Sequence, residues 1–294
     1  MATTKVADLG DTIPTIIEEA QFTRQFKAAM RPLCWTIKKG KGTNINVPYW
    51  GEFTANALTE GVDMVQSETM VDTNVQIVPG EVGLKGILTD TVIEDDNEDL
   101  KRAMGVLLGD AYEKKLDIDL LGQLDDAATS LAGASTTLSM GHIAASRATL
   151  AGNITANGGP APMPYVVVIH PFGELDLVDV VTPVLSAAGT SVSSFGGGFA
   201  DEVLARYSIG RLFGMPIVID GNIPIDSSND CKGGVFAAGK RGAIIYGHAR
   251  EPGLEPQRDG SARGWELNYV GRYGVGEFRS QWIVELYHNA SAPA

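Results

Sequence analysis

The feature that most constrains the fold is a long amphipathic stretch between Glu94 and Gly133, EDDNEDLKRAMGVLLGDAYEKKLDIDLLGQLDDAATSLAG. It opens with acidic residues, which are favoured at the N-terminus of a helix. A continuous helix here would be on the order of 50 Å long, far longer than an average helix. We assign residues 91–135 to this helix. Its apolar residues recur at helical spacing at Leu100, Met104, Leu107 and Ala111, and after a small register shift at Leu116, Leu120, Leu124 and Ala127.

The residues before this helix predict two segments without a core of their own. Residues 1–45 are interpreted as an N-terminal arm with a short helix that has Pro14 in its first turn. Residues 46–90 are interpreted as an extended loop, in which two alternating stretches, TNINVPYW and MVDTNVQIVP, flank the polar, acidic GEFTANALTEGVDMVQSETM. Because a two-stranded excursion of this kind cannot build a core, it needs a surface to lie on. That surface can belong to another chain.

The residues after the long helix predict a compact α/β or α+β domain over 136–250 and long antiparallel strands over 251–294. The domain contains a helix starting at Ser139, a buried strand YVVVIH, a helix after Pro171, a helical ADEVLARYS and a strand with a turn in MPIVIDGNIP. Asp259-Gly260 is a turn signal between the later strands, and the last strand alternates Trp282, Val284 and Leu286.

One stretch has the spacing of a phosphate-binding loop, G-x-x-x-x-G-K, from Gly234 to Lys240. Such a loop needs Ser or Thr after the lysine to hold magnesium, and a helix whose amides face the phosphate. Here Arg241 follows the lysine, and GAIIYG is typical of a strand. We therefore interpret the Gly-Lys-Arg-Gly sequence as a tight hairpin turn.

The composition argues against several classes of function. The formal net charge of −13 disfavours sequence-specific nucleic-acid binding, which needs clustered Lys and Arg. Cys34 and Cys231 fit no metal spacing and no disulfide scaffold, which suits a reducing compartment. No signal peptide or membrane span is present. No set of nucleophile, base or metal ligands emerges, so we predict no catalytic, cofactor-binding or metal-binding residue and no enzymatic activity.

The order of the parts resembles the major capsid protein family of tailed bacteriophages, which has the Hong Kong 97-like coat fold. The resemblance covers essentially the whole chain and rests on VGLKGILTDTVIEDDNEDL, YVVVIHPFGELDLVD, RLFGMPIVIDGNIP and YGVGEFRSQWIVELYH. It implies an α+β fold in which residues 91–135 are the spine helix of a peripheral domain. Residues 136–250 would form an axial domain, and residues 251–294 the returning strands of the peripheral domain.

The resemblance also implies a function. It predicts a coat protein that self-assembles, as pentamers and hexamers, into an icosahedral virion shell around double-stranded DNA, which it encloses without sequence-specific contacts. Synthesis would take place in the cytoplasm of the bacterial host, and no membrane would be involved. Some relatives carry a cleaved scaffolding segment before the arm, whereas this chain begins with Met1 and the arm. The resemblance then implies either a separate scaffolding protein or a chain recorded after processing, and the initiator Met1 favours the former. We expect a portal protein as a further partner, with room for a decoration protein.

The charges of the loop and of the tail suggest how subunits meet. We predict that acidic residues of the loop, Glu60, Asp63 and Glu68, meet basic residues of the tail, Arg258, Arg263 and Arg272, across subunits. Joints near Gly40, Gly42 and Gly133 could let one chain fit both pentamers and hexamers. The loop has no lysine between residues 51 and 84, which argues against a loop-lysine cross-link there.

Three alternatives belong to other classes. An encapsulin-type shell would package an enzyme in place of a genome, and it would need a pocket for a cargo peptide. An α/β ligand-binding enzyme would use the glycine-rich loops at 196–198 or 239–242. A phage tail or decoration protein would lack the long spine helix.

Overall fold

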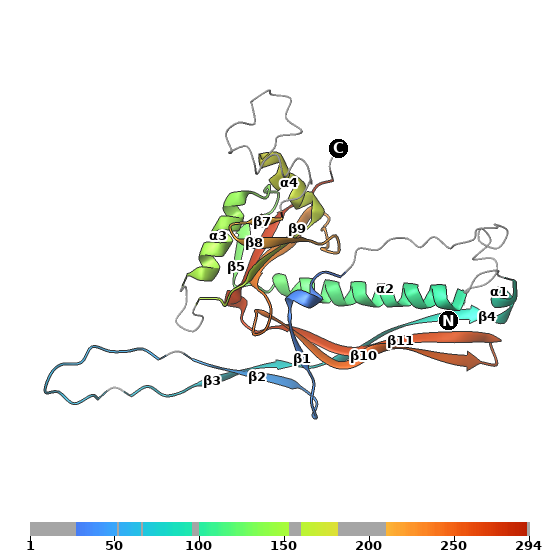
Figure 1. Ribbon diagram of the computed structural model, residues 1–294, viewed down its shortest axis with the longest axis horizontal. Helices are drawn as coiled ribbons and strands as arrows, with labels where there is room; N and C mark the ends of the chain where they lie inside the picture. The colour runs from blue at the N-terminus through green and yellow to red at the C-terminus, as the bar shows by residue number, and fades with distance from the viewer. Residues whose placement is uncertain are drawn as a thin grey trace, which may run out of the picture.

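The computed structural model describes residues 28–51, 53–65, 67–95, 100–152, 160–181 and 210–292. A long four-stranded sheet with one helix lying along it forms the lower part of the molecule in Figure 1. A six-stranded sheet with two helices forms the upper part, and a two-stranded hairpin extends to one side. The described elements are therefore arranged as two sheets, each with its own helices, and one extended hairpin.

The four-stranded sheet has the order β1–β10–β11–β4. Its strands are β1 (Trp35–Lys38), β10 (Ile244–Asp259), β11 (Gly264–Glu277) and β4 (Gly80–Thr89). The pair β1–β10 is parallel, and the other pairs are antiparallel. The two longest strands, β10 and β11, meet at the predicted Asp259-Gly260 turn, where the Asp259 carboxylate accepts hydrogen bonds from the backbone and hydroxyl of Ser261. A 3-10 turn, η2 (Arg31–Leu33), precedes β1.

The long helix is shorter than the sequence predicted. α1 (Asp90–Asp95) and α2 (Leu100–Leu121) follow β4, and a 3-10 turn, η3 (Gly122–Leu124), ends α2. At 1.5 Å per residue, the 22 residues of α2 span about 33 Å. The prediction of helix up to residue 135 is wrong, because β5 (Thr129–Ala132) pairs in parallel with a strand near the C-terminus. Strand pairing overrides local helical propensity there.

One row of side chains along α2 packs on the four-stranded sheet. The row consists of Met104, Leu108, Tyr112, Leu116 and Leu120, of which the last four are buried. Leu107, which the sequence placed on the apolar face, is 43% exposed, because the face that meets the sheet runs through Leu108. Two glycines of the sheet make room for the row: Gly86 lies under the Met104 sulfur, and Gly271 lies under the Tyr112 hydroxyl, where a Cβ would collide with the ring.

The hairpin that extends from the molecule is held at its root alone. β2 (Ile45–Trp50) and β3 (Asp72–Ile77) pair antiparallel, with Val47 opposite Val75. Their inward side chains join a buried cluster with residues of β10 and the segment after β11, made of Ile45, Val47, Ile77, Ile245 and Phe278. Beyond this root, residues 51–71 form the tip of the hairpin, which projects away from both sheets (Figure 1). The predicted two-stranded excursion is confirmed.

The six-stranded sheet has the order β5–β12–β9–β6–β8–β7. Its further strands are β12 (Ile283–Asn289), β9 (Asp230–Ala237), β6 (Tyr165–Ile169), β8 (Met215–Ile219) and β7 (Arg211–Leu212). The predicted buried strand is confirmed, since all five residues of β6 are buried. α3 (Met140–Ala151) begins as predicted, with Ser139 accepting a hydrogen bond from the His142 amide in a capping box. α4 (Pro171–Val181) begins at the predicted proline.

The last strand lies in a different sheet from the one predicted. The sequence assigned residues 251–294 to the peripheral domain, but β12 lies between β5 and β9 in the six-stranded sheet. A 3-10 turn, η4 (Ser280–Trp282), separates it from β11. Because β12 has neighbours on both faces, Ile283, Val284 and Leu286 are all fully buried, in place of the predicted one-sided alternation.

The segment with phosphate-loop spacing is a turn between the two sheets. β9 and β10 flank it but do not pair with each other, so the predicted hairpin is wrong. Its amides are used inside the chain: Ala238 N donates to Pro164 O, Gly239 N to Leu33 O and Gly242 N to Gly239 O. With these amides occupied, the turn offers no cradle for a phosphate.

Several predictions lie outside the described residues. They are the short helix around Pro14, the ADEVLARYS helix, the glycine-rich loop at 196–198 and residues 96–99 of the acidic run.

Candidate subunit interface

The tip of the extended hairpin, residues 51–71, carries large apolar side chains that the described part of the chain leaves exposed. Phe53, Leu58, Val62, Met64 and Val65 are each at least 62% exposed. Exposed apolar patches of this kind mark interaction sites in soluble proteins. The two arms of the tip also enclose an open hollow of about 490 Å³, whose lining includes Leu58, Val62, Met64 and Val65. The tip is therefore a surface that a partner would complete.

The predicted acidic residues lie on this same tip. Glu60, Asp63 and Glu68 are all exposed, and Asp63 and Glu68 line the hollow. The turn at the end of the tip is closed by a hydrogen bond of 3.2 Å from Val62 N to Thr59 O. The three carboxylates therefore surround the apolar residues and give the tip a negative rim.

The predicted basic residues do not form one patch. Arg258 forms an ion pair with Asp90 at the start of α1, and its guanidinium lies 5.7 Å from the centre of the Trp265 ring. Arg272 is half-buried and donates from Nε to Pro79 O at 3.2 Å. Arg263, at the β10–β11 turn, is exposed, and its guanidinium makes no ion pair or hydrogen bond with the described residues. Of the three arginines, Arg263 alone is therefore free to meet another subunit.

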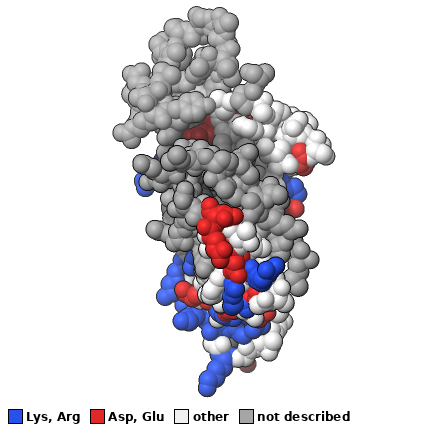
Figure 2. All heavy atoms as spheres, turned by 90° about the vertical axis from the view of Figure 1, so that its right-hand side faces the viewer, with Lys and Arg blue, Asp and Glu red and all other residues white. Residues whose placement is uncertain are grey.

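Figure 2 looks at the end of the molecule from which the β10–β11 turn projects. Lys and Arg side chains gather over the lower part of this end, and acidic side chains lie above them. A basic stretch lies at the root of the extended hairpin: Lys38 ends β1, and Lys39 and Lys41 lie between β1 and β2. None of these three lysines forms an ion pair with any residue that the structure describes. The hairpin thus has a basic root and an acidic tip.

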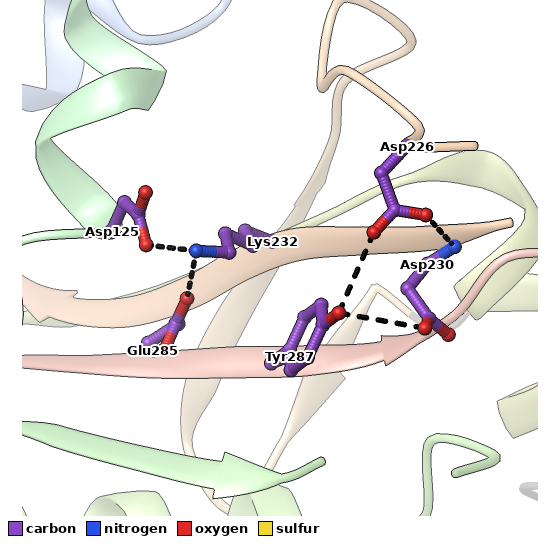
Figure 3. A network of polar contacts seen from close by, with 6 residues as sticks. All are labelled: Asp125, Asp226, Asp230, Lys232, Glu285 and Tyr287. Carbon is purple, nitrogen blue, oxygen red and sulfur yellow. Dashed lines mark hydrogen bonds and ion pairs between the residues drawn. The ribbon is translucent and has the colours of Figure 1, made fainter. Parts of the chain in front are cut away.

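A charged cluster on the six-stranded sheet tests the enzymatic alternative (Figure 3). Lys232 on β9 bonds to Asp125 after α2 and lies 3.5 Å from Glu285 on β12. Tyr287 donates to Asp226 and Asp230, at 3.5 Å each. The hydrogen bond to Asp125 raises the pKa of Lys232, and the hydrogen bond from the Asp230 amide lowers the pKa of Asp226. Both shifts favour the ordinary charged forms, so the cluster ties the end of α2 to β9 and β12 rather than moving protons.

Other kinds of site are not visible in the described part of the chain. Among residues 28–292, outside the gaps given above, no three His, Cys, Asp or Glu side chains are grouped so as to hold a metal ion. No helix in the same residues combines the length and apolar character that crossing a membrane requires.

Comparisons with known proteins point to a structural protein. The family described as phage capsid protein matches residues 82–284. No curated protein matches the sequence.

Solved structures from phages are similar over nearly the whole chain. An acid-stable capsid structure of Helicobacter pylori bacteriophage KHP30 matches with a TM-score of 0.73 and 10% identity, covering 99% of each chain. A capsid structure of cyanophage P-SCSP1u matches with a TM-score of 0.68 and 14% identity, covering 94% of this chain and 93% of that one. A structure from Mycobacterium phage Che8 matches with a TM-score of 0.67 and 18% identity, covering 92% and 95%. At these identities the likeness is one of fold, and the fold is the one that the order of the parts predicted.

Proposed function

Because the chain belongs to the phage capsid protein family and is a major capsid protein that forms the phage shell, we propose that residues 51–71 make the main contact between neighbouring subunits. The observation that carries this proposal is the group of apolar side chains on the tip that the described residues leave exposed, Phe53, Leu58, Val62, Met64 and Val65. The encapsulin and enzyme alternatives are not favoured.

Burial of the tip supplies the driving force for the contact. A Val, Leu, Met or Phe side chain that passes from water into a packed interface contributes about 1.5–3 kcal/mol. Ordering the tip and bringing two subunits together offset much of this gain, so a single contact is modest. A closed shell repeats the contact at every subunit, and repetition makes the sum large.

The charge distribution along the hairpin favours one relative orientation of neighbouring subunits. The acidic tip, with Glu60, Asp63 and Glu68, lies at one end of the hairpin, and the lysines at its root lie at the other end. Arg263 adds a free positive charge at the β10–β11 turn. A tip that meets basic residues of the next copy makes a head-to-tail contact, and such contacts close into rings when the rotation allows. We therefore retain the predicted acidic–basic pairing with Arg263 and propose that Arg258 and Arg272 act within their own subunit.

The rest of the proposed role follows from the family. We propose that the rings are the pentamers and hexamers of an icosahedral shell around double-stranded DNA. The net charge of −13 keeps the wall from adhering to its genome. We also propose a separate scaffolding protein, a portal and a decoration protein as partners, and assembly in the cytoplasm of the host.

Electron microscopy of the purified chain, with size-exclusion chromatography in low and high salt, tests this function. We expect closed shells, tubes or capsomer rings. Packaged nucleic acid supports the phage coat, whereas a packaged enzyme supports an encapsulin. A monomer that persists under crowding and with added scaffold would contradict the proposal.

A paired charge reversal tests the acidic rim. In Glu60→Lys with Asp63→Lys, the tip becomes basic and would repel the lysines and Arg263 of the next copy, so assembly should fail at low salt. Asp95→Lys with Asp126→Lys is the matched control, since both residues are exposed, lie off the tip and give the same change in net charge. If the two double variants assemble equally well and with the same salt dependence, the acidic rim has no part in the contact.

A further inference from the structure

A buried carboxylate holds the root of the N-terminal arm. Asp117, near the C-terminal end of α2, is fully buried. Its Oδ1 accepts hydrogen bonds from the backbone amides of Ala29 at 3.1 Å and Met30 at 3.0 Å, and its Oδ2 accepts one from Asn222 Nδ2 at 2.9 Å. Met30 is itself fully buried in the main core. One side chain of the spine helix thus fastens both the arm and the segment after β8.

A second buried carboxyl faces the first. Asp220, directly after β8, is also fully buried. It accepts a hydrogen bond of 2.9 Å from the Asn222 amide through Oδ1, whereas its Oδ2 has no hydrogen-bond donor among the described residues. The side chain of Asp220 is within hydrogen-bonding reach of Asp117. Two ionised carboxylates offer no donor to each other and repel strongly at this range.

A proton resolves this conflict, and its place can be assigned. Both oxygens of Asp117 already accept hydrogen bonds from N–H donors, so Asp117 is the acceptor of the pair. Asp220 then carries the proton and donates it from Oδ2. Burial, with the hydrogen bond to Asp117 as the next cause, raises the pKa of Asp220 to about 7. This arrangement is that of a carboxyl pair sharing one proton near neutral pH.

Other ionisable groups around the pair do not compete for this proton. Asp117 on α2 is the one described ionisable group that acts on Asp220, and the arm contributes only the Ala29 amide. The Cys34 thiol at the arm root lies close to Asp117, but burial, and next the charge of Asp117, raise its pKa to about 12, so it stays neutral. Arg31 and Glu113 pair with each other at 3.3 Å near the surface.

We propose that the proton shared by Asp117 and Asp220 is a latch that ties the arm root at Ala29–Met30 to the spine helix and to the segment after β8, and that losing this proton loosens the root. The sign follows from linkage. An Asp whose folded pKa is raised stabilises the closed state fully below its unfolded pKa of about 4, and this stabilisation is lost as the pH rises to the folded value. A subunit in acid therefore keeps its arm root fixed, and a subunit in alkaline solution can move it.

Hydrogen exchange at the Ala29 and Met30 amides of the full-length chain tests the latch. Rates are measured from pH 5 to pH 8.5 and divided by the intrinsic exchange rate at each pH. Because opening releases one proton, protection should fall by up to about tenfold per pH unit up to pH 7 and then level off. Protection that does not change with pH would overturn the proposal.

Two variants separate the proton from simple packing. Asp220→Asn places an amide donor against Asp117 at every pH, so its protection should stay high and lose its pH dependence. The infrared band of a protonated carboxyl, visible in the wild type below pH 7, should disappear in this variant. Glu113→Gln, on the same helix and facing the arm at the surface, is the control and should keep the wild-type slope. If the protection of Ala29 and Met30 still falls with pH in Asp220→Asn, another group causes the pH dependence, and the latch is refuted.

Discussion

The strand β6 and the hairpin tip at 51–71 contain similar apolar residues, but these residues are buried in β6 and exposed on the tip. In β6 all five residues of YVVVI are buried, and its neighbours on both sides are strands of the same sheet. On the tip, Val62 and Val65 are 63% and 89% exposed. Hydrophobicity alone therefore does not decide burial. What differs is whether the described part of the chain supplies a second layer, and our proposal assigns the layer over the tip to another subunit.

The strongest test of this difference removes a large side chain from each region. Phe236 on β9 is fully buried opposite Val166 and Ile283, so Phe236→Ala should lower the free energy of unfolding by about 3–5 kcal/mol. Phe53→Ala, on the tip, removes the same atoms from a side chain that is 62% exposed and should change it by less than about 0.5 kcal/mol. Urea unfolding of unassembled subunits measures both. Equal losses would mean that the tip folds onto the subunit in solution.

A smaller effect is expected where the spine helix meets the sheet. A Cβ at Gly271 would collide with the Tyr112 ring, so Gly271→Val should cost about 1–3 kcal/mol by overpacking and should tilt α2 away from β11. Gly253→Val on the neighbouring strand β10 is the matched control, since a Cβ there meets nothing within 4 Å. Thermal unfolding of the two variants checks this, and equal melting temperatures would show that α2 does not rest on that glycine.

The sequence predicted local elements well because their signals are local. The alternation around β2 and β3, the β-branched run of β6 and the capping Ser139 each depend on neighbouring residues. The failures involve partners distant in the chain. Residues 129–132 carry no strong strand signal, and they form a strand because β12, more than 150 residues later, pairs with them.

The interface was predicted only in part for the same reason. Exposed carboxylates can be inferred from a polar stretch, and Glu60 and Asp63 are exposed. The ion-pair partner of an arginine cannot be inferred in this way, because it can lie far away in the sequence. Arg258 is paired with Asp90, 168 residues away. Asp117 sits in a helix among other charged residues, so nothing local distinguished it from an exposed side chain, although it is fully buried. Whether a given side chain is exposed or covered therefore becomes clear only from the folded structure.

Acid should weaken the body around β6 while leaving the tip unchanged. His170, directly after β6, is buried and accepts a hydrogen bond from the Phe172 amide, and burial, followed by the charge of His288, lowers its pKa. A lowered pKa means that the unfolded chain binds the proton first, so stability is lost as the pH falls from about 6.5 through the folded value. Each unit of lowering is worth about 1.4 kcal/mol.

His170→Asn isolates this contribution. Its side-chain oxygen can still accept from the Phe172 amide, but it does not titrate. Unfolding free energies at pH 8 and pH 5 should therefore differ less in this variant than in the wild type. If the free energy of unfolding falls equally in both proteins between pH 8 and pH 5, the acid sensitivity is assigned to His288, because burial also lowers the pKa of His288.

The smallest effect on the subunit should come from the most exposed apolar residue. Val65→Ser on the tip removes apolar surface that only water touches in the free chain, so the free energy of unfolding should change by less than about 0.5 kcal/mol. In a shell the same residue would be buried, where losing a Val contributes about 1.5–3 kcal/mol at every contact. The lowest protein concentration at which shells assemble should therefore rise about tenfold or more, because 1.4 kcal/mol is a factor of ten.

Light scattering measured over a range of protein concentrations gives this assembly threshold. Val78→Ser is the control, because Val78 is exposed outside the tip. If Val65→Ser and Val78→Ser raise the assembly threshold equally, exposed valines promote association anywhere on the surface. That result would contradict the proposal that the tip makes the contact.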